Sequence, residues 1–262
     1  MKSRNLLLLA ALFAALQIQA WAQTNAANAT NLVAVPAAPP HVNQAIVPVS
    51  RTGSITNRQA QVLARAKNGA GDYDIEFIGD SITQGWETAG KNVWADYYGK
   101  RKVINFGVSG DRTENVLWRF EQGQLEGVKA KVAVVMIGTN NSNKNKDGTE
   151  AFSDSDILGG VTAVVEGIRQ RQPDTKILLL GIFPRGSAFN PQRGRLLEIN
   201  QALARLDDGQ HVFFTDFGSR FIENDGTISK EMMRDALHPG EKGYRIWAEA
   251  IEPKLKELLG EK

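Results

Sequence analysis

Five short, nearly continuous apolar segments alternate with longer stretches of helical periodicity, and this alternation limits the folds that the chain can adopt. The apolar segments span residues 75–78, 103–106, 132–137, 177–180 and 212–215. Apolar runs of this length are typical of strands buried on both faces. Helical patterns are clearest over residues 156–172, 193–206 and 241–259. Strands that alternate with helices predict crossover connections, and therefore an α/β fold built on a parallel sheet.

The length and the N-terminal sequence predict a leader, a linker and one domain. Lys2 and Arg4 precede an apolar run over residues 6–16, and small residues surround a cleavage point after Ala22, so residues 1–22 are predicted to be a secretory signal peptide. The run is shorter than the ~20 residues of a spanning helix, which argues against an uncleaved anchor. Residues 23–52 are rich in Ala, Asn and Pro and are predicted to be a flexible tether, with a packed arm as the alternative. Residues 53–262 are long enough for one catalytic domain.

Charge and cysteine content exclude several classes of function. Loss of residues 1–22 removes two cations and no acids, so the formal net charge falls from +2 to zero, which argues against a nucleic-acid partner. The chain has no cysteine, which excludes disulfides, thiolate metal sites and a lipidated N-terminal cysteine. We therefore expect an exported protein, periplasmic or extracellular, without stable membrane insertion after signal cleavage.

Three side chains have the chemistry of a nucleophile, a base and an orienting acid. Ser81 follows the first predicted strand, and Asp235 lies three residues before His238. Residues i and i+3 share one face of a helical turn, so the carboxylate could fix the imidazole tautomer and stabilise the imidazolium. Of the two other histidines, His41 lies in the predicted tether and His211 opens a predicted strand, so His238 is the candidate base.

Two further loops follow predicted strands and offer hydrogen-bond donors. Gly110 can present its backbone N–H without a side chain in the way, and Asn140 offers a side-chain amide. Taken singly, such residues are usually turn formers or helix caps, and Asp80 is interpreted in that way. Because the carboxyl ends of parallel strands form one edge of a sheet, these loops and the catalytic side chains are predicted to converge there. Together they predict an acyl-transfer site in which Gly110 and Asn140 stabilise an oxyanion.

Four sequence blocks resemble the catalytic blocks of the SGNH (GDSL) hydrolases. They are Phe-Ile-Gly-Asp-Ser-Ile-Thr-Gln-Gly over residues 77–85, Asn-Phe-Gly-Val-Ser-Gly-Asp over 105–111, Gly-Thr-Asn-Asn over 138–141 and Asp-Ala-Leu-His-Pro over 235–239. Within that superfamily the chain is most similar to the catalytic subunits of the intracellular platelet-activating factor acetylhydrolases and their bacterial relatives. The residues that carry the closer similarity span 116–126, 181–186 and 190–193.

The resemblance implies a three-layer α/β/α flavodoxin-like fold with a five-stranded parallel sheet. It also implies Ser81 as nucleophile, His238 as base and Asp235 as orienting acid, with an oxyanion hole formed by the Ser81 and Gly110 amides and the Asn140 side chain. The chain departs from those relatives in its predicted export signal and in Ser109, where they have glycine. The similarity therefore extends to the mechanism more than to the substrate.

We expect a cofactor-free serine esterase with a small acyl-ester substrate. Ile82 follows the nucleophile and Leu237 precedes the base, so these two branched side chains are predicted to bind the substrate and to limit the acyl group to acetyl or propionyl. An exported enzyme of near-zero charge favours O-acetylated carbohydrate as the substrate. A lipid ester, hydrolysed by an acetylhydrolase or lysophospholipase, is the alternative.

Hypotheses from other classes are a flavodoxin-like electron carrier and another non-catalytic binding protein. A flavin carrier would need a phosphate loop after the first strand, where Asp80 would repel the phosphate. No metal is required by the expected mechanism. The sequence leaves open whether the chain forms a homodimer.

Overall fold

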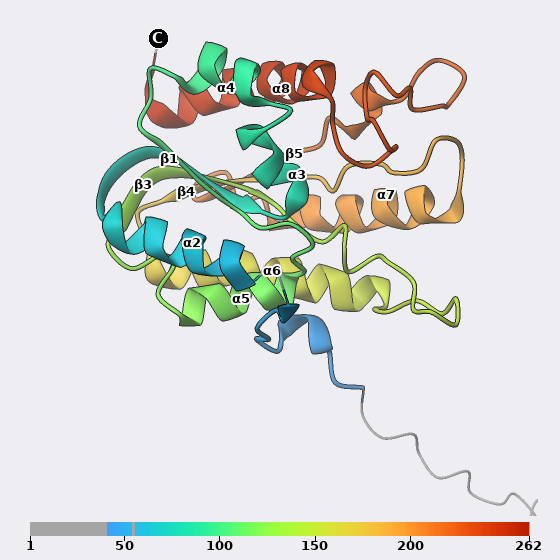
Figure 1. Ribbon diagram of the computed structural model, residues 1–262, viewed down its shortest axis with the longest axis horizontal. Coiled ribbons are helices and arrows are strands. Elements are labelled where there is room, and N and C mark those ends of the chain that lie inside the picture. Colours follow the sequence, from blue (N-terminus) through green and yellow to red (C-terminus); the bar gives the residue numbers. More distant parts are fainter. Residues whose placement is uncertain (1–40, 54–55, 262) are drawn as a thin grey trace, which may run out of the picture. The chain divides into compact units, whose positions relative to one another are not determined.

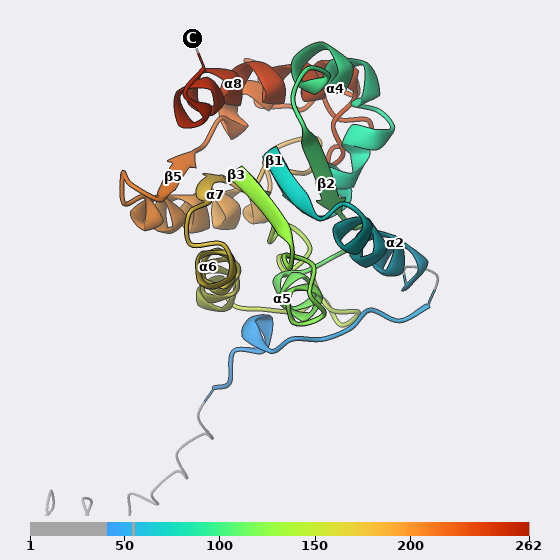
Figure 2. The same cartoon turned by 90° about the vertical axis from the view of Figure 1, so that its left-hand side faces the viewer.

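The computed structural model describes residues 41–53 and 56–261, and the domain begins at Asn43. Its centre is a five-stranded parallel sheet in the order β2-β1-β3-β4-β5 (Figures 1 and 2). The strands are β1 (Gly71–Gly79), β2 (Val103–Gly107), β3 (Val128–Met136), β4 (Lys176–Leu180) and β5 (Val212–Thr215). The predicted α/β class and five-stranded parallel sheet are confirmed.

Helices cover both faces of the sheet, which makes the three layers of the predicted fold (Figure 2). One face packs against α2 (Thr56–Asn68), α5 (Thr113–Glu121), α6 (Asp154–Arg171) and α7 (Pro191–Leu203). The other face packs against α3 (Ser81–Gln84), α4 (Lys91–Tyr98) and α8 (Glu241–Leu259). Short 3₁₀ helices complete the list: η1 (Gln44–Ile46), η3 (Gly85–Glu87), η4 (Ala204–Leu206) and η5 (Gly218–Phe221).

Strand β3 shows why the central strands have continuous apolar sequences. Val132 and Val134 pack into the core beneath α4 and α8, whereas Ala133 and Val135 pack into the core beneath α5 and α6. Successive side chains of a strand point to opposite faces, and here both faces are covered by helices. Every position from Val132 to Met136 is therefore buried and apolar, whereas the first residues of the strand alternate, with Lys129 and Lys131 exposed.

The segment before α2 corrects one expectation. Ala45 is fully buried, and its carbonyl accepts a hydrogen bond from the Thr113 hydroxyl at 2.8 Å. Val49 exchanges hydrogen bonds with α5, accepting from the Asn115 amide at 2.8 Å and donating to the Glu114 carbonyl at 3.1 Å. The last part of the predicted tether is thus packed, so the structured domain begins at about residue 43 rather than at 53. The predicted signal peptide and residues 23–40 lie outside the described residues.

Within residues 41–53 and 56–261, no helix combines the length and the apolar character that a membrane crossing requires.

Candidate active site

The structure brings the three predicted catalytic side chains into one hydrogen-bonded chain. Ser81 is the first residue of α3 and directly follows β1, while Asp235 and His238 lie in the loop before α8. The Ser81 Oγ is 2.8 Å from the His238 Nε2, and the His238 Nδ1 is 2.7 Å from the Asp235 Oδ2. A carboxylate can only accept, so Nδ1 carries the proton and Nε2 is left to accept from the Ser81 hydroxyl. This is the arrangement of a nucleophile with its base and orienting acid.

The loop from Asp235 to His238 is held in shape by its own carboxylate. The Asp235 Oδ1 accepts the backbone N–H groups of His238 at 2.8 Å and Leu237 at 3.2 Å. Burial by itself would raise the pKa of Asp235, but the hydrogen bonds from the His238 backbone and ring outweigh it and hold this pKa below its ordinary value. Asp235 therefore stays ionised opposite the imidazole.

Ala236 lets the loop turn back on itself. Its φ of 58° lies in the left-handed region, which is unfavourable for a residue with a Cβ. No other non-glycine residue in the described ranges has a positive φ. The Ala236 carbonyl accepts from the Gly186 N–H at 2.8 Å, so the segment that follows β4 supports the strained turn. Strain of this kind is found where a functional geometry depends on it.

The loops after β1, β2 and β3 carry the three candidate oxyanion donors, on Ser81, Gly110 and Asn140. No acceptor is present among the described residues for the backbone N–H of Ser81 or of Gly110, although buried or half-buried amides are normally paired. Asn140 supplies the third donor, and its Nδ2 also donates to the Asp111 carbonyl at 2.8 Å. The same Nδ2 also donates a longer hydrogen bond, 3.4 Å, to the Asp80 Oδ2, and this weaker bond is the one that an oxyanion would replace.

The loop that contains Gly110 is held by two side chains. The Ser109 N–H donates to the Gln84 Oε1 at 2.8 Å, and the guanidinium of Arg51 donates to the Gly110 carbonyl. Gly110 has a φ of 74°, and a Cβ there would come within about 3 Å of the Arg51 guanidinium. The backbone conformation favours glycine at this position, and a larger residue would also displace the end of the Arg51 side chain.

A fully buried ion pair lies beneath the same loop. The Arg119 Nε is 3.0 Å from the Asp111 Oδ2, and neither side chain has exposed surface. Burial raises the pKa of Asp111 to about 6, although the charge of Arg119 opposes the change. The pair anchors the residue whose carbonyl orients Asn140.

Asp80 caps the helix that begins with the nucleophile. Its Oδ1 accepts from the Ile82 N–H at 2.9 Å, as expected for a turn former, and its Oδ2 lies 3.4 Å from the Asn140 Nδ2. Burial raises the pKa of Asp80 to about 7; the Ile82 N–H opposes this effect, and the nearby Asp111 reinforces it. Arg185, which donates to the Thr139 carbonyl at 3.0 Å, places its positive charge near both Asp80 and Asp235.

The two predicted acyl-binding residues differ in their surroundings. Ile82 has no exposed surface and packs in the core beneath α4 and α8, where its carbonyl accepts from the Tyr244 hydroxyl at 2.7 Å. Leu237 is half-buried and lines a hollow of about 610 Å³ together with Arg185 and Gln192. Leu237 therefore meets solvent beside the reacting groups, whereas Ile82 lies behind the nucleophile.

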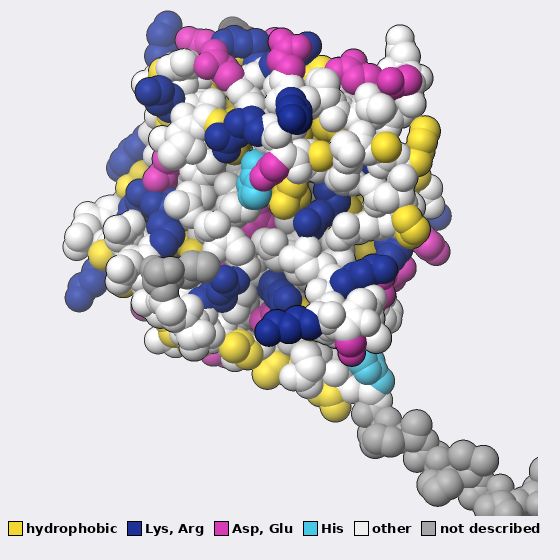
Figure 3. All heavy atoms as spheres, turned by 45° about the vertical axis from the view of Figure 1, so that its right-hand side comes forward, with side chains coloured by type: hydrophobic (Ala, Val, Ile, Leu, Met, Phe, Trp, Pro, Cys, Tyr) yellow, Lys and Arg dark blue, Asp and Glu magenta, His cyan; other side chains and the backbone are white. Residues whose placement is uncertain are grey.

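Two hollows flank the catalytic residues. The Leu237 hollow contains Asp235, and a second hollow of about 520 Å³ contains Gly110 and Asn140. Figure 3 shows a histidine beside an acidic side chain near the middle of one face, with Lys and Arg side chains gathered around it.

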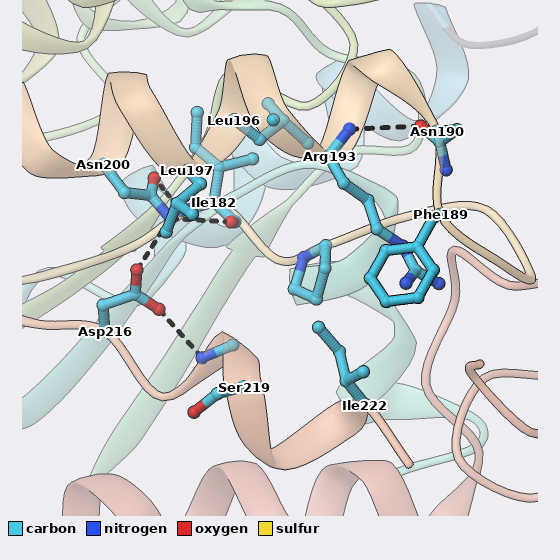
Figure 4. A pocket seen from close by; sticks show the side chains of 13 residues that line it. Ile182, Phe189, Asn190, Arg193, Leu196, Leu197, Asn200, Asp216, Ser219 and Ile222 are labelled. Carbon is cyan, nitrogen blue, oxygen red and sulfur yellow. Dashed lines mark hydrogen bonds between the residues drawn. The ribbon is translucent and has the colours of Figure 1, made fainter. Parts of the chain in front are cut away.

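A cavity of about 650 Å³ lies between α7 and the residues around η5 (Figure 4), and it shares Phe189 and Asn190 with the Leu237 hollow. Its walls are mainly apolar and include the exposed side chains of Phe189 and Leu197. The carboxylate of Asp216 is engaged by the Asn200 amide at 2.9 Å and by the Gly218 N–H at 2.8 Å. The lining of this cavity includes none of Ser81, Asp235 and His238, so the reaction site lies outside it.

Comparison with known proteins decides the family. The model of the GDSL-like lipase/acylhydrolase family matches residues 77–246, which include every residue discussed at the site except Arg51. The chain belongs to this family. A curated relative, platelet-activating factor acetylhydrolase IB subunit alpha1 of Homo sapiens, is 34% identical over 189 residues, covering 72% of this chain and 78% of the relative. The chain is therefore an enzyme of the acylhydrolase class, and the carrier and binding-protein hypotheses are set aside.

Solved structures of lower sequence identity share the fold of this chain. A structure described as a putative platelet activating factor from Streptococcus pneumonia has a TM-score of 0.61 and 22% identity, covering 76% of this chain and 92% of the other. A structure of an acetyl xylan esterase has a TM-score of 0.54 and 20% identity, covering 69% and 98%. At these identities the two structures support the fold alone.

Sequence reasoning missed the residues that support the site from a distance. Arg51 lies in the predicted tether, and the Tyr244 hydroxyl reaches the site from α8. Arg185 belongs to the 181–186 segment, whose similarity to the acetylhydrolases was the signal that could have identified it. In the part of the chain that the structure describes, no group of three His, Asp or Glu side chains is arranged to hold a metal ion.

Proposed function

We propose that this protein is a serine esterase that hydrolyses short acyl esters, acetyl esters above all, with Ser81 as nucleophile. The observation that carries the proposal is the unbroken hydrogen-bond chain from Ser81 through His238 to Asp235, with two unpaired backbone N–H groups beside it. A relative that is 34% identical is named an acetylhydrolase, which supports the acetyl group.

The geometry supports the following reaction. The Ser81 Oγ bonds to the carbonyl carbon of the ester while its proton passes to the His238 Nε2, 2.8 Å away. The carbonyl oxygen becomes an oxyanion, which accepts hydrogen bonds from the Ser81 and Gly110 amides and from Asn140. The bond to the alcohol oxygen then breaks, and His238 gives its proton to the departing alkoxide.

A water molecule completes the cycle on the acylated serine. His238 takes a proton from the water, whose oxygen bonds to the acyl carbon, and the same donors hold the second oxyanion. Breakage of the bond to Oγ returns the proton to Ser81 and releases the carboxylic acid. Asp235 stabilises the imidazolium in both halves of the reaction without itself accepting the proton.

The acyl group is proposed to lie between Leu237 and the turn that carries Ile82. Each added methylene gains about 0.8 kcal/mol where it fits an apolar space, but forcing one into filled space costs ~1 to 3 kcal/mol. Ile82 is fully buried, so the space behind the nucleophile is already occupied. Activity should therefore fall beyond acetyl or propionyl, and replacing both residues by alanine should move the optimum to longer acyl chains.

The alcohol is proposed to be a carbohydrate. Both hollows beside the catalytic residues include polar side chains, such as Gln192 in one and Asn143 in the other, whereas the cavity of about 650 Å³ is mainly apolar. Sugars present many hydroxyls and suit such a surface better than a lipid chain does. A structure of similar fold is named an acetyl xylan esterase. Export, as predicted from residues 1–22, would place the enzyme where acetylated polysaccharide is found.

Hydrolysis rates separate these proposals from the lipid alternative, which the named acetylhydrolase relative favours. We would measure kcat/KM for 4-nitrophenyl acetate, butyrate and octanoate, for acetylated xylo-oligosaccharides and for an acetylated glycerophospholipid. The expected order is acetate above butyrate above octanoate, and oligosaccharide above lipid. Ser81→Ala should abolish turnover, while Ser109→Ala, which removes a neighbouring exposed hydroxyl, should retain it. An octanoate optimum would contradict the acyl pocket, and a lipid preference would contradict the carbohydrate assignment.

A further inference from the structure

The hollow of about 520 Å³ that contains Gly110 and Asn140 is formed by segments that lie far apart in the sequence. One wall comes from residues 49–52, which precede α2, and another from the first turn of α5 with Arg112, Glu114 and Asn115. Two of its lining residues are also proposed oxyanion donors, so the hollow opens directly beside the carbonyl oxygen of a bound ester. A group attached to the ester within a few bonds of the carbonyl would therefore lie in it.

Positive charge dominates the accessible lining of this hollow. Of its ten lining residues, Arg51 and Arg112 are the cations and Glu114 is the only anion. The side chain of Arg112 is 36% exposed, whereas that of Glu114 is 9% exposed, and the two charges are 3.9 Å apart. The Glu114 carboxylate also accepts from the Asn141 amide at 3.0 Å. The anion thus lies beneath the surface with its own hydrogen bonds, and the cation faces the hollow.

Both guanidinium groups retain donors for a ligand. Among residues 41–53 and 56–261, the Arg51 side chain has one hydrogen-bond acceptor, the Gly110 carbonyl, although a guanidinium carries five N–H groups. Arg112 lies over the Phe152 ring at 5.3 Å, which holds the guanidinium plane in place without using its N–H groups. Fixed guanidinium groups with unused N–H donors are well suited to carboxylate, which they can bind through paired hydrogen bonds.

We propose that this hollow is a subsite for a carboxylate on the alcohol part of the substrate, as on an acetylated uronic acid. The inference rests on the proposed esterase function and narrows its substrate from neutral to acidic carbohydrate esters. Asn115 and Asn143 line the hollow with neutral amides that suit the hydroxyls of the same sugar. Arg51 and Arg112 would bind the carboxylate while the ester carbonyl lies on the adjoining donors.

A charge-matched substrate pair tests the proposal. We would compare kcat/KM for acetylated glucuronic acid with that for acetylated glucuronamide, which differs only in carrying a neutral amide. We expect the wild type to prefer the acid by about tenfold, as for a charge-assisted hydrogen bond at a partly exposed site. The preference should shrink as salt is added, because mobile ions screen the attraction.

Two variants localise the effect. Arg112→Gln should reduce the acid-to-amide preference to near unity, whereas Lys129→Gln, which removes an exposed charge at the opposite edge of the sheet, should retain it. The ratio of the two substrates cancels any general loss of activity in a variant. Equal rates for acid and amide in the wild type, or the same loss in both variants, would overturn the subsite.

Further measurements separate the ligand chemistry from the esterase function. A second pair, 1-acetylglycerol 3-phosphate and 1-acetylglycerol, presents phosphate in place of carboxylate, and a preference confined to this pair would overturn the carboxylate assignment. Ser81-dependent hydrolysis of 4-nitrophenyl acetate reports the proposed function alone. If that activity is present and the acid preference is absent, the subsite proposal fails while the esterase stands.

Discussion

Replacing Glu76 should make the protein more stable, by an amount that depends on pH. Glu76 lies in the middle of β1, paired with Ile104 of β2 and Ala133 of β3, and has no exposed surface. Neither of its carboxylate oxygens has a hydrogen-bond partner among the described residues. Burial raises the pKa of Glu76 from its ordinary value of 4.5 to about 8, although the neighbouring Gln172 side chain opposes the change.

The sign and the size of the effect follow from proton linkage. Below about pH 4.5 the carboxyl of Glu76 is neutral in both the folded and the unfolded chain, so it does not lower the free energy of unfolding. Between pH 4.5 and about pH 8 the unfolded chain is ionised while the folded chain keeps the proton, so stability falls by ~1.4 kcal/mol for each pH unit. The total loss in the free energy of unfolding reaches at most about 5 kcal/mol at pH 8 and stays constant at higher pH.

Urea unfolding of the wild type and Glu76→Gln, followed by tryptophan fluorescence, measures this cost. The free energies of unfolding should differ little near pH 5, and the variant should gain on the wild type steadily up to about pH 8. Other titrating groups, such as Asp80 and Asp111, are present in both proteins and cancel in the difference. Glu166→Gln, which replaces an exposed acid, should show no such divergence. A difference that is the same at every pH would refute the reasoning.

Three further changes test the site itself. Asp235→Asn should lower kcat by roughly 10³- to 10⁴-fold with the fold intact, because the amide favours the wrong imidazole tautomer; wild-type kcat with a normal circular dichroism spectrum would remove Asp235 from the reaction. Asn140→Ala should lower kcat by about 10²- to 10³-fold if its amide holds the oxyanion, whereas an effect on KM alone in steady-state kinetics would make it a substrate-binding residue. Tyr244→Phe should cost about 1 to 3 kcal/mol in urea unfolding, because the buried Ile82 carbonyl loses its donor; an unchanged unfolding midpoint would show that this bond contributes nothing.

The sequence predicted the sheet and the reacting groups because both depend on patterns that are local in the chain. Strands buried on both faces have continuous apolar sequences, and β5 (Val212–Thr215) was predicted with its observed bounds. The side chains of Ser81 and His238 could be placed together because every parallel strand ends at the same edge of the sheet.

The supporting contacts could not be predicted because they depend on backbone groups and on distant elements. The larger apolar side chains around Ala45, such as Ile46 and Val49, are exposed, and the segment is fixed instead by hydrogen bonds to α5, which composition does not reveal. Helix α2 (Thr56–Asn68) was not predicted, since its buried face includes the polar Gln59 beside Val62 and Ala66. The contact of Arg51 with the Gly110 carbonyl joins residues 59 positions apart and has no local signature.

Covalent labelling tests the central claim, that Ser81 is the nucleophile, most directly. The purified protein would be treated with a fluorophosphonate, which reacts with activated serine hydroxyls, and the labelled peptide would be identified by mass spectrometry. We predict a single adduct, on Ser81, which forms at the same rate as hydrolysis of 4-nitrophenyl acetate is lost. The Ser81→Ala variant should form no adduct, and the His238→Ala variant should form it much more slowly. Continued hydrolysis by fully labelled protein, or an adduct on another serine that accounts for the lost activity, would contradict the account.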